Sequence, residues 1–437
     1  MKAIITRLLA VALLGVLLLP SVVAADVSLE KRATNPNQDQ LPDVPENFCL
    51  QYRDVAVKVL GSSERTASIQ NGLSSVTAIS QSVTNNVQIK EMGIEKSILF
   101  IDGIWLKEQK MEDYVDDVRE YILSGIPVIV IGEQSEIIKE AIRGYRSTFL
   151  YEKHATTNGY YYNPMTNTGV FLSIGNVSAD APQAIKDKDT ATIASLAYAW
   201  ASNQLNGRAQ NGAQTVLASG APYWVPRDPL EWYSNDQFSP YGRVHIWVKP
   251  QRLMNEDLTN NYILLQHDFD GMPGSQEFGN GWWLDFLQQR DHFAYQSSRN
   301  QDRIYDAAPG TTTNQQSINI GIGGGIGSGG GQMSGSISWG YSGSEVQVTY
   351  SGNSGIGLID WRHELPEGNL LPDSNVPKHT YSAEPGCTIS TPNNDIAVDE
   401  DMDVGFAQRH IITIWPMPPI IYYDRYTAHC WISGTVS

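Results

Sequence analysis

The stretch SINIGIGGGIGSGGGQMSGSISWGYSGSEVQVTY, from Ser317 to Tyr350, organises the interpretation of the whole chain. Two arms alternate apolar residues with small or polar ones, and Gly occupies eight of the eleven positions from Gly321 to Gly331. Because successive side chains of a strand point to opposite faces, each arm has one apolar face and one small polar face. The pattern predicts a long, Gly-rich amphipathic β-hairpin over residues 313–350. Its apolar face consists of Ile318, Ile320, Ile322, Ile337, Trp339, Tyr341, Val346, Val348 and Tyr350.

Short predicted strands flank this hairpin. Arg243–Val248 alternates apolar and polar residues, Asn261–His267 is a second run, and His429–Ser433 is the last of several more, with Gly, Pro and Asn between them. Many short strands separated by turn residues are typical of a β-sandwich. The sequence therefore predicts an all-β sandwich domain over residues 243–437 that carries the hairpin.

A different pattern precedes this region. Ser97–Ile101 is a continuous apolar run, as in a buried parallel strand. Met111–Leu123 has apolar residues at helical spacing, and Ile126–Ile131 is a second buried strand. Strand, helix and strand in this order form a βαβ unit. The predicted boundaries are an α/β domain over residues 47–215 and a linker over residues 216–242.

Residues 1–25 are typical of a secretory signal peptide. Lys2 and Arg7 precede the apolar run Leu8–Pro20, and small residues follow it. The polar residues 26–46 then form a flexible leader. The sequence therefore predicts a protein that is secreted or displayed at the extracellular surface.

The charge of the chain restricts its partners. The formal charge is −17, and loss of the signal peptide makes it −19, because two basic residues and no acidic ones are removed. An acidic protein is repelled by nucleic acid and by anionic lipid headgroups. We therefore expect no nucleic-acid partner, and we expect any contact with a membrane to depend on apolar and aromatic residues.

Three cysteines occur in the chain. In an exported protein one disulfide is expected. Cys387 and Cys430 lie in the same predicted β-rich region, so we expect these two to pair, which leaves Cys49 over.

Few residues suggest catalysis or ligand binding. Asp102 ends the first buried strand, where sites form in α/β folds, although an Asp at this position also forms turns. Asp268 and Asp270 share one face of a predicted strand beside His267 and are candidates for binding or acid–base work, with a plain strand end as the alternative. The acidic run Asp399–Asp403 is expected to be a solvated loop. Nucleophile, zinc-protease and nucleotide motifs are missing from the contexts they require, so we predict no enzyme, no cofactor and no metal.

An amphipathic hairpin has a specific use in an exported protein. Strands of about 9–11 residues with one apolar face can span a bilayer when several copies close them into a barrel. The segments Ser317–Gly324, Gly335–Tyr341 and Glu345–Tyr350 resemble the stem of leukocidin-like β-pore-forming toxins, over about residues 240–437. This resemblance implies a homo-oligomer that folds the hairpin against a β-sandwich and inserts it into a target membrane. The α/β domain has no counterpart in that toxin core.

The same pattern also fits a second interpretation. A surface, structural or adhesive protein could assemble by pairing strands between copies, with the apolar face covering its own sandwich or a neighbouring subunit. A secreted hydrolase is a third, weaker interpretation. Leakage of lipid vesicles separates the first interpretation from the other two.

Overall fold

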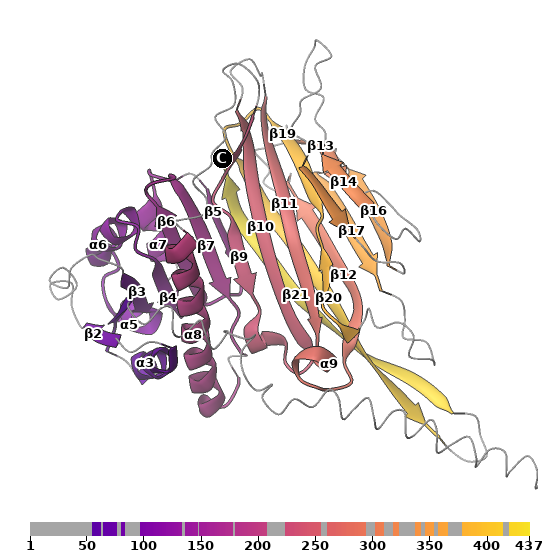
Figure 1. The fold of residues 1–437 in the computed structure, drawn as a ribbon, viewed down its shortest axis with the longest axis horizontal. Coiled ribbons are helices and arrows are strands. Elements are labelled where there is room, and N and C mark those ends of the chain that lie inside the picture. The colour runs from indigo at the N-terminus through magenta and orange to yellow at the C-terminus, as the bar shows by residue number, and fades with distance from the viewer. Residues whose placement is uncertain are drawn as a thin grey trace, which may run out of the picture.

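The computed structural model describes sixteen segments of the chain. These are residues 55–62, 64–76, 80–83, 97–132, 136–146, 148–177, 180–207, 223–254, 260–293, 302–309, 318–322, 337–341, 346–353, 357–365, 378–413 and 419–437. The predicted signal peptide, the leader and Cys49 lie outside them. The described chain is mostly β-sheet, with a smaller number of helices (Figure 1).

The longer of two large sheets, here called sheet 1, runs through most of the described chain. Its strands, in spatial order, are β13 (Arg303–Ala308), β19 (Gly386–Thr391), β11 (Asn261–Pro273), β10 (Gly242–Met254), β9 (Leu230–Tyr233), β7 (Thr168–Ile174), β6 (Thr157–Asn163), β4 (Val128–Ile131), β3 (Ser97–Asp102), β1 (Ala56–Leu60) and β2 (Ser80–Val83). Two short strands attach to it, β18 (Tyr381–Ala383) beside β11 and β8 (Tyr223–Pro226) beside β10.

The second large sheet, sheet 2, and a small separate sheet complete the strands. Sheet 2 contains, in spatial order, β16 (Gln347–Asn353), β17 (Leu358–Glu364), β12 (Trp283–His292), β20 (Ile396–Ile412), β21 (Ile420–Val436) and β5 (Phe149–Glu152). The small sheet pairs β14 (Ile318–Ile322) with β15 (Ile337–Tyr341). The helical elements are α3 (Glu64–Val76), α5 (Gly103–Glu108), α6 (Glu112–Leu123), α7 (Glu136–Ile142), α8 (Gln183–Gly207), η1 (Asn235–Phe238) and α9 (Gly274–Glu277).

The N-terminal part of sheet 1 is covered by helices on both faces. β2, β1, β3 and β4 run parallel, as the predicted βαβ unit requires. Leu99 and Ile101 of β3 pack in one cluster with residues of α5, α6 and α7, whereas Ile98 and Phe100 pack with α3 and α8. This double burial explains the continuous apolar run of β3 in the sequence. The predicted helix over Met111–Leu123 is confirmed as α6.

The two large sheets pack face to face in the C-terminal half. Trp361 and Phe406 of sheet 2 share one buried cluster with Ile246 and Phe269 of sheet 1. Side chains of sheet 2 reach the backbone of Gly271 of β11, where an added Cβ would lie 2.9 Å from Leu284 Cδ2. Each large apolar side chain buried here contributes about 1.5–3 kcal/mol relative to an exposed one.

Sheet 1 continues across the predicted linker. β8, β9 and η1 all lie within residues 216–242, and β9 joins the two halves of the sheet. It pairs in parallel with β7 and antiparallel with β10, so Phe171 aligns with Leu230 and His245 with Tyr233. The division of the chain into two domains stays a prediction.

Two sequence predictions need correction. The predicted disulfide is wrong, because Cys387 on β19 and Cys430 on β21 are both free and each is buried on a different sheet. The acidic run Asp399–Asp403 is not a loop but the middle of β20. Strand alternation buries Glu400 and Met402 and leaves the three aspartates on the outer face, which explains why the run looked solvated.

None of the helices in the described segments is both long enough and apolar enough to cross a membrane.

Candidate functional site

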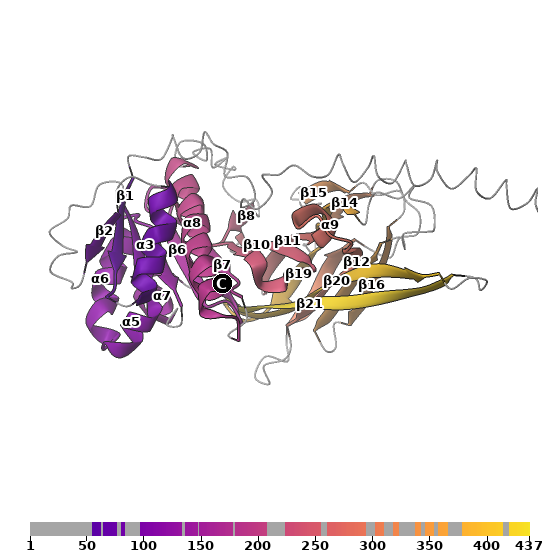
Figure 2. The same cartoon turned by 90° about the horizontal axis from the view of Figure 1, so that it is seen from below.

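The longest hairpin of the structure is formed by β20 and β21. Its strands stay in register from the pair Ile396 and Val436 to the pair Ile412 and Ile420. β12 accompanies β20 only as far as Ala407, so the distal residues Gln408–Ile412 and Ile420–Asp424 pair only with each other among the described residues. We call these distal residues the β20–β21 tip. They form a two-stranded ribbon that projects from the body of the molecule (Figures 1 and 2).

The β20–β21 tip exposes large apolar side chains. Of the eleven exposed large hydrophobic residues among those described, five lie here: Ile411 (50% exposed), Ile412 (44%), Ile420 (52%), Tyr422 (43%) and Tyr423 (38%). The segment that contains them, Ile411–Tyr423, reads IITIWPMPPIIYY and carries no charged residue. Scattered exposed apolar residues need no explanation, but a contiguous group of them marks a surface for a partner or a membrane.

Aromatic stacking holds the base of the ribbon. The ring of Tyr426 stacks on that of Tyr241 with centroids 3.7 Å apart, and Tyr241 meets Trp282 edge to face at 4.7 Å. Further out, Tyr423 contacts Trp283, with ring centroids 6.3 Å apart. Because these partners come from the turn before β10 and from the start of β12, the ribbon is fixed to the body at its base.

The Gly-rich hairpin of the sequence is present as β14 and β15. Ile318 aligns with Tyr341, Ile320 with Trp339 and Ile322 with Ile337, and the two strands pair with no other strand among the described residues. The pair contacts β13 and β19 and lies on the side of sheet 1 that faces away from β20 and β21 (Figure 2). No backbone ladder therefore ties the described strands of this hairpin to either large sheet.

The second arm of the predicted hairpin over residues 313–350 does not extend to Tyr350. Val346, Val348 and Tyr350 do not belong to the β14–β15 pair, and β16, which starts at Gln347, pairs with β17 in sheet 2. Val346 and Val348 are buried in the core cluster and Tyr350 packs beside Trp361, with ring centroids 6.0 Å apart. Their apolar alternation serves the core of the structure rather than the hairpin.

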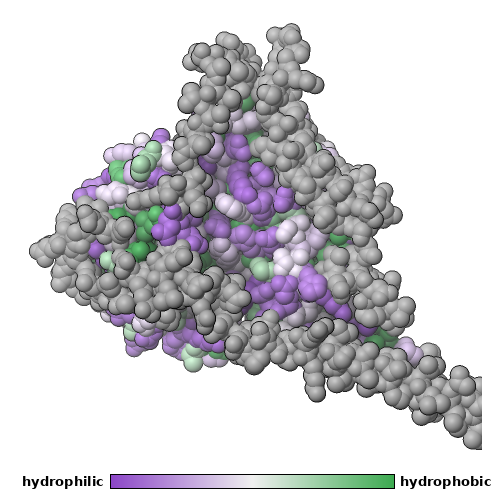
Figure 3. Space-filling view, viewed as in Figure 1, coloured by the Kyte–Doolittle hydropathy of each residue, from purple (hydrophilic) through white to green (hydrophobic). Residues whose placement is uncertain are grey.

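The predicted residues Asp268 and Asp270 lie on the outer face of sheet 1. Hydrophilic residues gather over β10 and β11 on this face (Figure 3). Asp268 pairs with Lys249, and the carboxylate of Asp270 lies 2.9 Å from Nδ1 of His245. Glu231 of β9 lies 3.4 Å from the other nitrogen of the same ring. Three neighbouring strands thus place one imidazole between two carboxylates.

This arrangement changes the charge of His245. Burial disfavours the protonated ring, but hydrogen bonds to Asp270 and Glu231 outweigh it and raise the pKa of His245 to about 9. Burial, and after it the same two carboxylates, raise the pKa of Tyr233. The hydroxyl of Tyr233 donates to Glu231, and its ring stacks on that of His245. The group is therefore a set of ion pairs at neutral pH.

A pH dependence of stability follows for His245. Because its pKa rises from 6.5 to about 9 on folding, the protonated ring stabilises the fold fully below pH 6.5, and this contribution is lost as the pH rises through 9. We expect His245→Gln to cost up to about 3 kcal/mol at pH 6 and much less at pH 10. Urea unfolding of both proteins across this range measures the difference, and a pH-independent difference would contradict the assignment.

Asp102, the third predicted residue, caps a helix. It is fully buried, and its carboxylate accepts from the backbone N–H of Ile104 at 3.0 Å and of Trp105 at 3.3 Å at the start of α5. The hydroxyl of Thr66 donates to its other oxygen at 2.7 Å. Two of these bonds cap α5 and the third reaches α3, so Asp102 holds α3 and α5 at the end of β3.

The cap makes a prediction of its own. Asp102→Ala removes the carboxylate that accepts these three hydrogen bonds, and we expect a loss of about 2–4 kcal/mol in the free energy of unfolding. Thr66→Val removes only one donor and should cost about 1 kcal/mol. Urea titrations compare the two variants. An Asp102→Ala protein as stable as the parent would show that the carboxylate does not serve stability and has another role.

Sequence reasoning missed two groups. The apolar ends Ile411–Trp415 and Ile420–Tyr423 have the pattern of ordinary strands, and only the lack of charge over thirteen consecutive residues signals an exposed tip.

The second group is His267, Asp291 and Glu400, which come from three distant segments and meet in the core. Burial and the neighbouring Glu400 raise the pKa of Asp291 to about 7. No spacing in the sequence could reveal this contact.

Comparison with known proteins places the chain near pore-forming toxins. No family model and no curated protein matches it. Among solved structures, it is similar to the delta-toxin of Clostridium perfringens, at 11% identity and a TM-score of 0.35 over 48% of this chain and 86% of that one. A pore-forming protein matches at 10% identity and a TM-score of 0.31, over 49% of this chain and 94% of that one. The NetB toxin of Clostridium perfringens in its membrane-inserted form matches at 8% identity and a TM-score of 0.26, over 46% and 95%.

These matches confirm the resemblance to leukocidin-like β-pore-forming toxins that the sequence predicts.

Proposed function

We propose that this chain is a secreted, non-enzymatic, pore-forming protein of the cytolysin type. Its C-terminal β-sandwich carries two membrane-active hairpins. The β20–β21 tip makes the first contact with lipid, copies of the chain assemble, and the β14–β15 hairpin then enters the bilayer. The observation that carries the proposal is the cluster of exposed isoleucines and tyrosines on a projecting tip, within the uncharged segment Ile411–Tyr423.

The chemistry of the tip favours lipid over a charged partner. Ile411, Ile412 and Ile420 supply apolar surface, and Tyr422 and Tyr423 supply rings with a polar end. Tyrosines of this kind concentrate at the interface between lipid and water. Since the chain has a formal charge of −17, attraction to anionic headgroups cannot supply the affinity. We therefore expect binding to zwitterionic vesicles that changes little with salt.

The β14–β15 hairpin suits a part that moves. It pairs with no other strand among the described residues, so its release costs packing against β13 and β19 but no ladder hydrogen bonds in those segments. A lone hairpin cannot cross a bilayer, because its edge N–H and C=O groups would be unsatisfied in lipid. Insertion thus requires several copies, and the homo-oligomer is part of the proposal.

Dye release tests this function directly. The chain is incubated with dye-loaded phosphatidylcholine vesicles, and the membrane fraction is sedimented and imaged by negative stain. We expect dye release together with ring-shaped oligomers that appear only with lipid.

Two other outcomes would overturn the proposal. Intact vesicles with no bound protein would remove the membrane role. Filaments or sheets formed without lipid would favour the surface or adhesive interpretation, in which the free edges of β14 and β15 pair with a neighbouring copy.

A further inference from the structure

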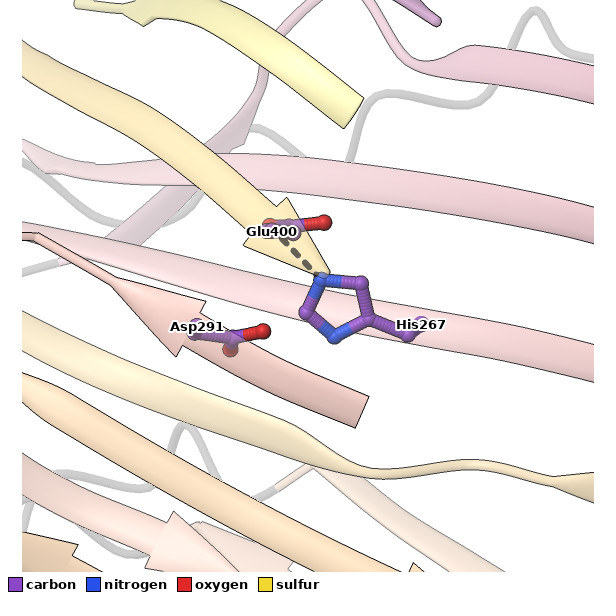
Figure 4. A group of neighbouring side chains, drawn as sticks. All are labelled: His267, Asp291 and Glu400. Atoms are coloured by element: carbon purple, nitrogen blue, oxygen red, sulfur yellow. Dashed lines mark hydrogen bonds and ion pairs between the residues drawn. The ribbon is translucent and has the colours of Figure 1, made fainter. Parts of the chain in front are cut away.

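Three ionisable side chains meet in the dry space between the two large sheets. His267 comes from β11 of sheet 1, and Asp291 and Glu400 come from β12 and β20 of sheet 2 (Figure 4). All three are fully buried, at 0% exposure. One donor atom from each lies within 4.8 Å of the other two, and both carboxylates lie beside the ring of His267.

The surroundings orient these groups. Nε2 of His267 lies 3.0 Å from Oε1 of Glu400, while Nδ1 lies 3.3 Å from the carbonyl oxygen of Pro385. Gln289 donates to Oδ1 of Asp291 at 2.9 Å. Metal-binding histidines commonly donate their second N–H to a backbone carbonyl, and metal-binding carboxylates commonly accept from a neighbouring side chain. The same two supports are present here.

The cluster also has an unused acceptor and a fourth donor. Oε2 of Glu400 is buried without a hydrogen-bond partner among the described residues, which is costly for a carboxylate. The thiol of Cys387, fully buried on β19, lies 3.6 Å from Oδ2 of Asp291. Three donors of the N, O and O types therefore lie together from three strands, and the thiol on a fourth strand lies beside Asp291 at the edge of this group.

We propose that His267, Asp291, Glu400 and Cys387 bind one zinc ion that joins sheet 1 to sheet 2. Zinc takes four ligands from this set in closed structural sites. Bound zinc leaves the net charge of the cluster unchanged, because its two positive charges replace those of the two protons lost, and it holds the two carboxylates by direct bonds in the buried core. It satisfies the free oxygen of Glu400, and on binding the thiol and the imidazole each release a proton. The ion would hold β20, the strand that carries the β20–β21 tip, against β11.

Metal analysis of the full chain, produced without a metal-affinity step, tests the site. We expect about one zinc per chain in the parent protein. Asp291→Asn and Glu400→Gln, which keep the size of the side chains, should lose it. His363→Gln is the matched control, because His363 is also buried in sheet 2 but hydrogen-bonds to Tyr381 outside the cluster, and it should keep its zinc. Zinc retained by Asp291→Asn would overturn the site.

A second measurement needs no variant. Removal of zinc by a chelator should lower the unfolding temperature of the parent protein, and added zinc should restore it. Replacement by Co²⁺ should give the strong visible bands of a tetrahedral site and a near-ultraviolet thiolate band from Cys387. A parent protein that takes up no zinc on refolding in its presence, or whose unfolding temperature ignores it, would show that protons alone balance this cluster. Gln289→Leu should bind zinc roughly 10- to 100-fold more weakly.

Discussion

The double variant Ile411→Asp/Ile420→Asp is expected to lose vesicle binding by at least about 100-fold. Both side chains are half exposed in the free protein, so each has apolar surface left to bury in lipid. Loss of each isoleucine removes about 1 kcal/mol of binding free energy, and each aspartate adds the cost of a charge at the membrane interface. The folded state should tolerate the change within about 0.5 kcal/mol, because the tip contacts little of the core. Co-sedimentation with phosphatidylcholine vesicles measures the binding.

A matched substitution separates the tip from a general effect of charge. Met165, at the turn between β6 and β7, is 86% exposed, so Met165→Asp makes the same kind of change on another part of the surface. This control should bind vesicles as the parent does. If both proteins lost binding, or if the double variant kept it, the tip would not be the membrane contact.

The sequence predicts the parts of the fold that depend on local pattern. The continuous apolar run of β3 reflects burial on both faces, the helical spacing of α6 reflects burial of one face, and the alternation of β10 reflects burial of every second side chain. The structure has all three elements. The pairing of the segments of β14 and β15 also agrees with the hairpin that the alternation around the glycines predicts. In each case the physical cause lies within about a dozen residues.

What the sequence hid depends on contacts between distant segments. Val348 alternates as an arm of the Gly-rich hairpin would, yet it belongs to the core, because the choice between β14 and β17 as a partner lies outside its own segment. Glu400 sits in a run of acidic residues, and only the position of sheet 1 turns it toward His267. The β20–β21 tip was missed because its apolar sequence is typical of buried strands, whereas among the described residues no third strand pairs with it.

The face of the β14–β15 hairpin can be tested one position at a time. By the alternation of the sequence, Ile320 falls on the predicted lipid-facing side and Ser338 on the opposite side. A lysine on the lipid face of a membrane-spanning strand costs about 2–4 kcal/mol near the middle of the bilayer, whereas the other face tolerates charge. Because every copy in an oligomer would carry the penalty, Ile320→Lys should abolish dye release.

Ser338→Lys supplies the control on the same ladder, since Ser338 aligns with Gly321, the neighbour of Ile320. It should release dye at nearly the parent rate, and both variants should still bind vesicles through the intact β20–β21 tip. The comparison distinguishes insertion from attachment, because only the first depends on which face of β14 and β15 meets lipid. Equal loss in both variants would mean that the hairpin is sensitive to any charge, as expected if it packs against a neighbouring copy and never enters the bilayer.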